Sequence, residues 1–157
     1  MLNIPNYLEL KKLSKKGKGI ISKKNISRGI IVIKFDEGVS IRPNKTATPT
    51  AIQIDQDSFL DSHPKQIRDY LNHSCDSNTK IDFNKMACIA IKDIKKGDEI
   101  TFNYFSTEYD LAIKNEDFTC FCGANNCFKQ IKGFKHLNKE QRKKLKSILT
   151  PYLTKKI

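Results

Sequence analysis

A mostly β fold with few short helices is predicted for this chain from three observations. The first half consists of short runs rich in β-branched and aromatic residues, and polar turns separate them. The run from Ile30 to Ile33 is β-branched throughout and is expected to be buried. Only two segments have a helical pattern, and 157 residues suffice for one domain with one core of moderate size.

Five short strands are expected in the first third of the chain, because each run is bounded by turn-forming residues. They span Tyr7 to Leu13, Gly19 to Lys23, Ile30 to Phe35, Val39 to Arg42 and Ala51 to Ile54. The composition of Asn44 to Pro49 indicates a loop. Pro64 to Tyr70 is expected to form a short helix that begins at Pro64, because proline is favoured in the first turn.

The second half is predicted to continue with a β-hairpin. Its strands are Thr79 to Phe83 and Met86 to Lys92, joined by a two-residue turn. A second turn, Asp93 to Asp98, leads into a strand from Glu99 to Tyr104. Many short strands and little helix make the chain mostly β.

The C-terminal segment from Asn138 to Leu149 is predicted to be an amphipathic helix. Asn138 can cap its N-terminus, with Gln141 three residues on, as in a capping box. Apolar side chains at positions 145, 148 and 149 would form its buried face. The lysine-rich run from Lys139 to Lys146 could dock on an acidic partner, but a solvated helix face is the simpler interpretation.

The formal net charge of +12 implies attraction to polyanions or acidic partner surfaces. The positive residues are nearly all lysine, with only four arginines, and they are scattered along the chain. Lysine lacks the planar fork that recognises bases and phosphates in a bidentate manner. A solvated lysine-rich surface is therefore favoured over a dedicated nucleic-acid site, although nucleic-acid binding stays an alternative.

The sequence also bears on the compartment. No stretch approaches the roughly 20 apolar residues that a membrane span needs, and the N-terminus lacks a charged-then-apolar signal pattern. The five cysteines are an odd number, which suits metal binding in a reducing compartment better than a disulfide framework. We therefore expect a soluble protein of the cytoplasm or nucleus that is neither secreted nor attached to a membrane.

Three cysteines within eight positions, Cys120, Cys122 and Cys127, predict a zinc site. Gly123 would allow the tight turn that such closely spaced ligands require. A closed tetrahedral site needs a fourth ligand. The residues that could supply it are Cys75, Cys88, His73 and His136. Cys88 lies inside an apolar run and is expected to be a core residue, and free thiols on a loop are the alternative to a metal site.

Three blocks of sequence carry a resemblance to a known family. They are Asn72-His73-Ser74-Cys75, Gly97 to Tyr104 (GDEITFNY), and Cys120 to Gly123 followed by Cys127. In this order they resemble the SET-domain protein-lysine methyltransferases with a post-SET zinc motif. The resemblance runs from about residue 16 to about residue 134. It implies the SET fold of several short-stranded sheets, in which the NHSC segment and the ITFNY strand cross in a pseudoknot, a topology that general chain-threading rules would have rejected.

The resemblance also implies a division of the chain. Residues 1–110 would form the SET domain, with a short central insert at 51–70, and residues 111–136 a zinc-binding post-SET flap. Residues 137–157 would be a helical tail. Cys75 would complete the zinc site with the three clustered cysteines and pin the flap beside the active site.

The resemblance further implies that the chain binds S-adenosylmethionine as methyl donor. The expected cofactor-binding residues are Lys16, Gly17, Lys18, Gly19, Asn72, His73, Tyr104 and Phe121. The two glycines let main-chain groups approach a ligand without an intervening Cβ. Taken alone, they are equally consistent with a turn, and the Asn-His pair with a hydrogen-bonded turn.

Tyr104 and Phe102 are the expected catalytic residues, again by resemblance. The Tyr104 phenol would orient the lysine amine for in-line attack on the methyl group. Phe102 has no hydroxyl to hold a water against that amine, which leaves room for a methylated nitrogen and predicts di- or trimethylation. Asp69 and Asn103 depart from the usual pattern, which has arginine and aspartate at these positions.

The sequence thus predicts a lysine methyltransferase that acts on a histone or another basic protein. Two alternatives belong to other classes. A zinc-containing nucleic-acid-binding module would explain the charge and the cysteines, but it leaves the NHSC and ITFNY motifs unexplained. A catalytically silent SET-like interaction domain would keep the zinc and the fold, although Tyr104, Asn72 and His73 argue against it.

Overall fold

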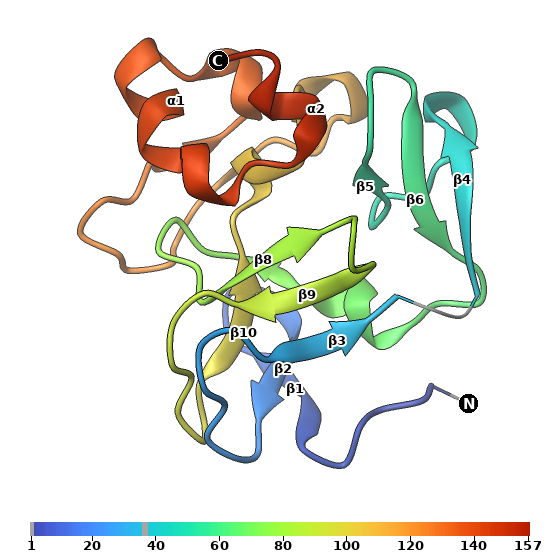
Figure 1. Cartoon of the computed structure of the whole chain (residues 1–157), viewed down its shortest axis with the longest axis vertical. Coiled ribbons are helices and arrows are strands. Elements are labelled where there is room, and N and C mark those ends of the chain that lie inside the picture. Colours follow the sequence, from blue (N-terminus) through green and yellow to red (C-terminus); the bar gives the residue numbers. More distant parts are fainter. Residues whose placement is uncertain (1, 36–37) are drawn as a thin grey trace.

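The computed structural model describes residues 2–35 and 38–157 and is mostly β (Figure 1). Within these ranges the strands form three sheets. The strands are β1 Leu8–Leu13, β2 Gly17–Ser22, β3 Ile31–Lys34, β4 Val39–Pro43, β5 Ile52–Gln53, β6 Ser58–Ser62, β7 Asn72–His73, β8 Thr79–Asp82, β9 Ala87–Ala90, β10 Glu99–Phe102, β11 Phe118–Thr119 and β12 Gln130–Ile131. The α-helices are α1 Lys139–Leu145 and α2 Pro151–Thr154. The 3-10 helices are η1 Asn44–Thr46, η2 Ile67–Tyr70, η3 Tyr104–Ser106, η4 Leu111–Lys114, η5 Phe134–His136 and η6 Lys146–Ile148.

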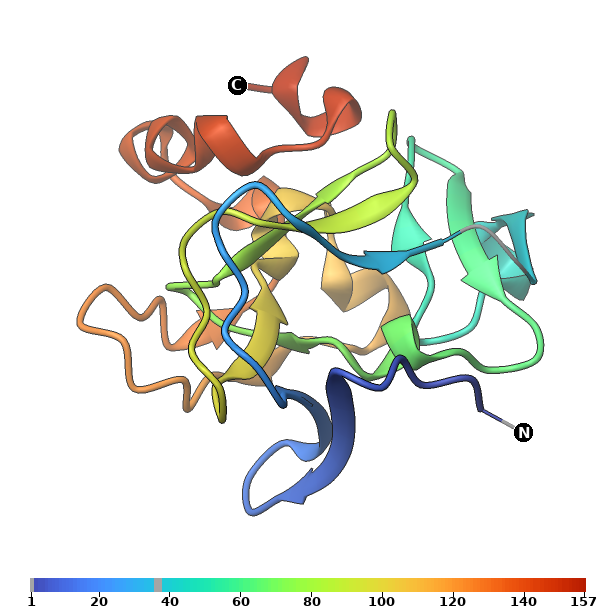
Figure 2. The same cartoon turned by 60° about the horizontal axis from the view of Figure 1, so that its bottom comes forward.

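The main sheet has the order β1-β2-β10-β8-β9-β3, and β7 pairs with β10 outside this path. At its centre β10 runs parallel to β7, with Thr101 opposite Asn72 and Phe102 opposite His73. Segments about 30 residues apart in sequence therefore lie side by side. The predicted hairpin is confirmed, because β8 and β9 pair in antiparallel fashion. Figure 2 shows the β1–β2 ribbon and the C-terminal helices on opposite sides of the molecule.

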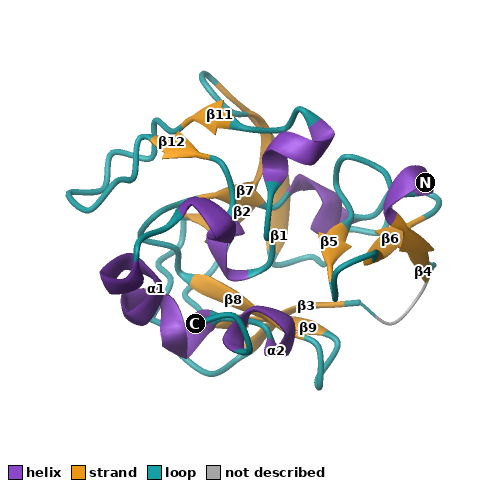
Figure 3. Ribbon diagram, turned by 90° about the horizontal axis from the view of Figure 1, so that it is seen from above, coloured by secondary structure: helices purple, strands orange, loops and turns teal. Residues whose placement is uncertain are grey.

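The expected insert contains most of a second sheet, with the order β4-β6-β5. Strand β6 was not predicted, because Asp61 interrupts its apolar pattern. The Asp61 side chain is 1% exposed and accepts hydrogen bonds from the Thr48 main-chain N–H (3.0 Å) and hydroxyl (2.6 Å). A buried carboxylate with these partners fits inside a strand without an unsatisfied charge. Figure 3 shows this sheet well apart from β11 and β12.

Two hydrophobic clusters form the interior. The first fills the main sheet and includes Ile20, Val32 and Ile100. The second packs the C-terminal segment against the cysteine-rich region, and its buried members are Cys75, Phe105, Leu111, Cys120, Ile131, Phe134, Leu137, Leu145 and Leu153. The last 20 residues are thus anchored by burial of apolar side chains beside the cysteines.

Three local expectations are corrected by the structure. Ile30 is 53% exposed, because β3 begins only at Ile31. The helix expected from Pro64 begins at Ile67, where Gln66 and Asp69 form a capping box. Tyr104 lies in η3 just after β10 ends.

The predicted start of the C-terminal helix is confirmed, but its predicted end at Leu149 is wrong. Asn138 accepts a hydrogen bond from the Gln141 N–H, and the Gln141 side chain accepts one from the Asn138 N–H (both 2.9 Å). The helix ends at Leu145, continues as η6, and is followed by α2, which was not predicted. Within the described residues, no helix has the length and apolar character that a membrane crossing requires.

Candidate active site

Two neighbouring cavities meet at one tyrosine. The first has a volume of about 300 Å³ and is called the flap cavity; it is lined by Lys15, Lys16, Asn72, His73, Tyr104, Phe118, Thr119, Cys120 and Phe121. The second has a volume of about 190 Å³ and is called the insert cavity; it is lined by Pro49, Thr50, Ala51, Ile52, Arg68, Asp69, Leu71, Phe102, Tyr104, Glu108, Leu111, Glu116 and Phe118. Of the described residues, only Tyr104 and Phe118 line both, so these two side chains separate the cavities.

Tyr104 is held by hydrogen bonds at both ends. Its hydroxyl donates to the Leu71 carbonyl (2.9 Å), and its main-chain N–H donates to Nδ1 of His73 (3.0 Å). Asn103 starts η3, accepting from the Phe105 N–H (3.0 Å), and its amide donates to the Cys75 carbonyl (3.4 Å). Asn103 is 1% exposed, so an aspartate at this position would bury a charge and lose the amide donor. The asparagine is therefore a structural fit at the start of η3.

His73 connects Tyr104 to the cysteines. Burial, with a further contribution from the Lys16 ammonium, lowers the pKa of His73 to about 3, so the ring is neutral. Because Nδ1 accepts the Tyr104 N–H, the ring proton lies on Nε2. Nε2 is 3.2 Å from Sγ of Cys75 and can donate to it. One imidazole thus fixes the Tyr104 main chain and supports a sulfur of the cysteine cluster.

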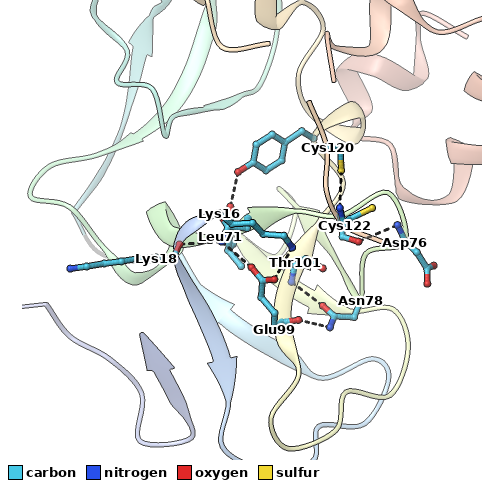
Figure 4. Close-up of polar contacts among 12 residues, drawn as sticks. Lys16, Lys18, Leu71, Asp76, Asn78, Glu99, Thr101, Cys120 and Cys122 are labelled. Atoms are coloured by element: carbon cyan, nitrogen blue, oxygen red, sulfur yellow. Dashed lines mark hydrogen bonds and ion pairs between the residues drawn. The ribbon is translucent and has the colours of Figure 1, made fainter. Parts of the chain in front are cut away.

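Asn72 joins the glycine-containing strand β2 to β10. Its amide donates to the Lys18 carbonyl (3.1 Å) and to Oε1 of Glu99 (2.9 Å), while Lys16 pairs with Oε2 of Glu99 (2.8 Å; Figure 4). Gly19 faces this network: a Cβ added there would lie 2.8 Å from both Asn72 Nδ2 and Glu99 Oε1. A side chain at position 19 would therefore displace the ends of the Asn72 and Glu99 side chains.

Four cysteines form a cluster with the dimensions of a zinc site. The sulfur atoms of Cys75, Cys120, Cys122 and Cys127 all lie within 4.8 Å of one another. Cys75 Sγ is 3.9 Å from the sulfurs of both Cys120 and Cys127. Tetrahedral coordination with Zn–S bonds of about 2.3 Å places sulfur atoms about 3.8 Å apart, so this donor set fits zinc. The structure therefore selects Cys75 as the fourth member.

Main-chain donors surround the sulfurs. The N–H groups of Phe128, Cys122 and Lys129 point to the sulfurs of Cys75, Cys120 and Cys127, each at 3.4 Å. Such donors stabilise thiolates, which are the form that binds a metal. The three other candidate ligands do not belong to the cluster. His73 lies beside it, with Nε2 3.2 Å from the Cys75 sulfur. Cys88 is fully buried in the main core, and His136 pairs with Asp110 (3.2 Å).

The insert cavity combines apolar walls with carboxylates. Phe102 and Leu71 line it together with Tyr104, and the Phe102 and Tyr104 ring centroids are 4.8 Å apart. Asp69, Glu108 and Glu116 also line it. Burial first, and then Glu108, Glu116 and Glu99, raises the pKa of the Tyr104 phenol, so the hydroxyl keeps its proton. The cavity is suited to a long apolar chain that ends in a cationic or neutral amine.

The structure brings most of the sequence-predicted site residues together. Lys16, Asn72, His73, Tyr104 and Phe121 line the flap cavity. The stretch Gly17 to Gly19 belongs to β2 and is joined to this group through Asn72 without lining the cavity. Phe102 lines the insert cavity.

Sequence reasoning missed the roles of three residues. Phe118 separates the cavities, Glu99 holds Asn72 and Lys16, and Leu71 accepts the Tyr104 hydroxyl. A signal existed for Glu99 alone, because it starts the strand that carries the ITF motif.

Comparison with known proteins decides the family. The model of the SET domain matches residues 17–105, which is more than half of the 157 residues. The chain belongs to the SET-domain family. The expected fold class is thereby confirmed, and the parallel contact of β7 with β10 joins the NHSC and ITFNY segments of this SET domain.

Relatives of this SET-domain chain are much longer proteins. The "Variant-silencing SET domain-containing protein" of Plasmodium falciparum (isolate 3D7) is 29% identical over 142 residues, 76% of this chain and 5% of the relative. A "Histone-lysine N-methyltransferase, H3 lysine-36 specific" of Debaryomyces hansenii is 32% identical over 89 residues, 52% of this chain and 12% of the relative. The chain thus spans only a small part of both relatives.

Solved structures share the fold of this SET-domain chain. The crystal structure of KRYPTONITE in complex with mCHG DNA and SAH has a TM-score of 0.60 at 24% identity, covering 78% of this chain and 28% of that one. The methyltransferase domain of human SETMAR, a histone-lysine N-methyltransferase, has a TM-score of 0.53 at 20% identity, covering 80% and 58%. At these identities the likeness concerns the fold.

Proposed function

We propose that this SET-domain chain transfers methyl groups from S-adenosylmethionine to the side-chain amine of a lysine in a protein. One observation carries the proposal: Tyr104 and Phe118 lie between two cavities whose other described lining residues are different. Methyl transfer is an in-line displacement, so donor and acceptor must reach the reacting carbon from opposite directions. A cavity on either side of one phenol provides that arrangement.

In this proposal the flap cavity holds S-adenosylmethionine and the insert cavity admits the lysine. The donor supplies an electrophilic methyl carbon: a C–N bond forms, the C–S bond breaks, and S-adenosylhomocysteine leaves. The lysine ammonium must first give its proton to water, and the positive charge of the sulfonium ends on the methylated nitrogen. A free lysine has a pKa of about 10.4, and the apolar walls of Phe102, Leu71 and Phe118 favour the neutral amine. Asp69, Glu108 and Glu116 attract the ammonium form as it enters.

The proposed partner is a protein that presents a lysine, either a histone or another basic protein. Relatives named as H3 lysine-36-specific methyltransferases support a histone, as does the fold likeness to KRYPTONITE bound to an H3(1-15) peptide and SAH (TM-score 0.58, 23% identity). The corresponding compartment is the nucleus or the cytoplasm, which are reducing and preserve free thiols.

The proposed metal is one structural zinc ion held by Cys75, Cys120, Cys122 and Cys127. Zinc would fix the flap of residues 111–136, whose Phe118 to Phe121 line the flap cavity. We keep the proposed division into SET domain (1–110), flap (111–136) and helical tail (137–157). The shared apolar cluster supports a tail that is packed on the flap.

The test is transfer of labelled methyl from S-adenosylmethionine to the proteins of a matched cell lysate by the zinc-loaded chain. We expect label on lysine, identified by amino-acid analysis of the labelled bands. Label on another residue type would refute lysine specificity. Cofactor binding without any transfer would favour the silent interaction domain, and salt-dependent nucleic-acid binding without cofactor binding would favour the zinc-containing nucleic-acid module.

Gly19→Ala is expected to weaken S-adenosylmethionine binding by about tenfold or more. The added Cβ would lie 2.5 Å from Leu13 Cδ1 and 2.8 Å from Asn72 Nδ2, so Asn72 must move. Overpacking of this kind costs about 1–3 kcal/mol, and 1.4 kcal/mol is a factor of ten in affinity. Calorimetric titration with S-adenosylmethionine measures the dissociation constant. Lys12→Ala on the neighbouring strand β1 is the control, since Lys12 is exposed and lines neither cavity; equal affinity of Gly19→Ala and the control would contradict the assignment of this cavity.

Phe102→Tyr is expected to shift the products toward monomethyl-lysine. Phe102 is 5% exposed and lines the insert cavity, so a new hydroxyl would occupy space needed by a methylated amine and could hold a water against it. Mass spectrometry of the methylated lysine gives the mono-, di- and trimethyl fractions. Phe83→Tyr, outside both cavities, serves as control. An unchanged product distribution in Phe102→Tyr would count against its role.

A further inference from the structure

The positive charge of the chain is unevenly distributed. Residues 129–157 contain ten Lys and Arg and a single acidic residue, Glu140, a net +9 of the total +12. The remaining 128 residues carry only +3. Lysines occur along the whole chain, but the acidic residues that balance them lie almost entirely before residue 129. The C-terminal segment is a separate basic unit.

One arginine gathers this segment into a compact lobe. Arg142 donates to the main-chain carbonyls of Leu137 (3.0 Å), Lys156 (3.2 Å) and Lys135 (2.9 Å), and its guanidinium lies 4.9 Å from the Phe134 ring centroid. All three nitrogens of its guanidinium thus donate inside the protein. Segments before α1 and after α2 are held together, and Figures 1 and 3 show α1 and α2 side by side. We call residues 129–156 the basic lobe.

Eight of the nine lysines in the basic lobe are exposed, whereas Lys156 packs over the Tyr109 and Tyr152 rings. The exposed ones are Lys129, Lys132, Lys135, Lys139, Lys143, Lys144, Lys146 and Lys155. Among the described residues only Lys135 and Lys143 of these form ion pairs, with Asp110 and Glu140 respectively. Lys139, Lys143 and Lys146 recur at helical spacing, so they follow one stripe. Several cations thus face the solvent with no acid to neutralise them.

We propose that the basic lobe binds the phosphate backbone of duplex nucleic acid without sequence preference. A duplex carries about one negative charge per 1.7 Å of its axis, which matches a surface almost free of acidic residues. Lysines act as point charges on phosphates, whereas base recognition favours the arginine fork, and Arg142 is occupied. Single strands would need exposed aromatic rings for stacking, but Phe134 is buried and Tyr152 already packs against Lys156.

The lobe differs in charge from the insert cavity, which is lined by Asp69, Glu108 and Glu116 with Arg68. A polyanion on the basic lobe is therefore compatible with a cationic side chain in that cavity. The duplex proposal does not depend on methyl transfer, and binding is measured without S-adenosylmethionine, so the two can fail separately.

The test is fluorescence anisotropy of a mixed-sequence 20-base-pair duplex with the zinc-loaded full chain over a range of salt concentrations. The lobe variant replaces Lys132, Lys139, Lys144 and Lys146 with glutamine. The matched control replaces Lys11, Lys12, Lys95 and Lys96, which are also exposed and, among the described residues, form no ion pair. Both variants change the formal charge from +12 to +8.

The lobe variant is expected to bind about tenfold or more weakly. The slope of log affinity against log salt should flatten by up to about 3.6, since each of the four lost phosphate contacts contributes about 0.9. The control should stay within about threefold of the parent chain. Equal losses in both variants would overturn the proposal in favour of diffuse attraction. Stronger binding of poly-glutamate than of the duplex would overturn it in favour of an acidic protein partner. Zinc content and circular dichroism verify that both variants are folded.

Discussion

Tyr104→Phe is expected to lower kcat/KM for methyl transfer by about 100-fold or more while S-adenosylmethionine still binds. The substitution removes one hydroxyl, which lies where the flap and insert cavities meet and donates to the Leu71 carbonyl. Loss of one preorganised polar group at a reacting centre costs about 10²–10³ in rate. Steady-state transfer to a lysine peptide measures the rate, and titration with S-adenosylhomocysteine measures binding.

Tyr152→Phe is the control for Tyr104→Phe. Tyr152 is half-buried in the C-terminal segment and lines neither cavity. The Tyr152→Phe variant should transfer methyl groups at the rate of the parent chain. Parental activity of Tyr104→Phe would show that the phenol oxygen takes no part in the reaction, and a parallel loss of cofactor affinity would assign Tyr104 to binding alone.

Removal of zinc is expected to unfold the flap and abolish methyl transfer. Cys120→Ala should act in the same way, because its sulfur is 3.9 Å from that of Cys75 and the residue lies in the second apolar cluster. Structural zinc contributes about 10–16 kcal/mol to the folding of small zinc domains. Loss of only about a quarter of this, about 3 kcal/mol, would lower Tm by about 6–12 °C at about 2–4 °C per kcal/mol. Thermal scans with and without a chelator measure this.

Cys88→Ala separates metal loss from general loss of a thiol. Cys88 is buried in the main core and lies outside the cysteine cluster. It should retain one zinc per chain, while Cys120→Ala should lose most of it. Unchanged zinc content in Cys120→Ala, or a chelator-insensitive Tm of the parent chain, would rule out the four-cysteine site.

The features that could be predicted from sequence are local ones. The β8–β9 hairpin and the Asn138–Gln141 capping box depend on residues a few positions apart. Strand β6 was missed because Asp61 breaks the apolar pattern of the strand. The buried Asp61 carboxylate is accommodated there by hydrogen bonds from Thr48, 13 residues away. The exposure of Ile30 follows from where β3 begins, which the uniform β-branched run does not reveal.

The candidate site was predictable where a motif names the residue. The four cysteines, Asn72 and Tyr104 belong to such motifs, and the structure brings them together. The position of Phe118 between the cavities depends on how its ring packs against His73 and Tyr104, which adjacent sequence does not encode. The link from Tyr104 through His73 to Cys75 likewise exists only in three dimensions.

The most direct measurement is a crystal structure of the zinc-loaded chain with S-adenosylhomocysteine and a lysine peptide. We expect the adenosyl group between Lys16, Asn72 and Phe121 in the flap cavity, and the lysine side chain in the insert cavity. The amine nitrogen should face the cofactor sulfur beside the Tyr104 hydroxyl. Both ligands in one cavity, or a cofactor bound away from Asn72, would contradict the two-sided site.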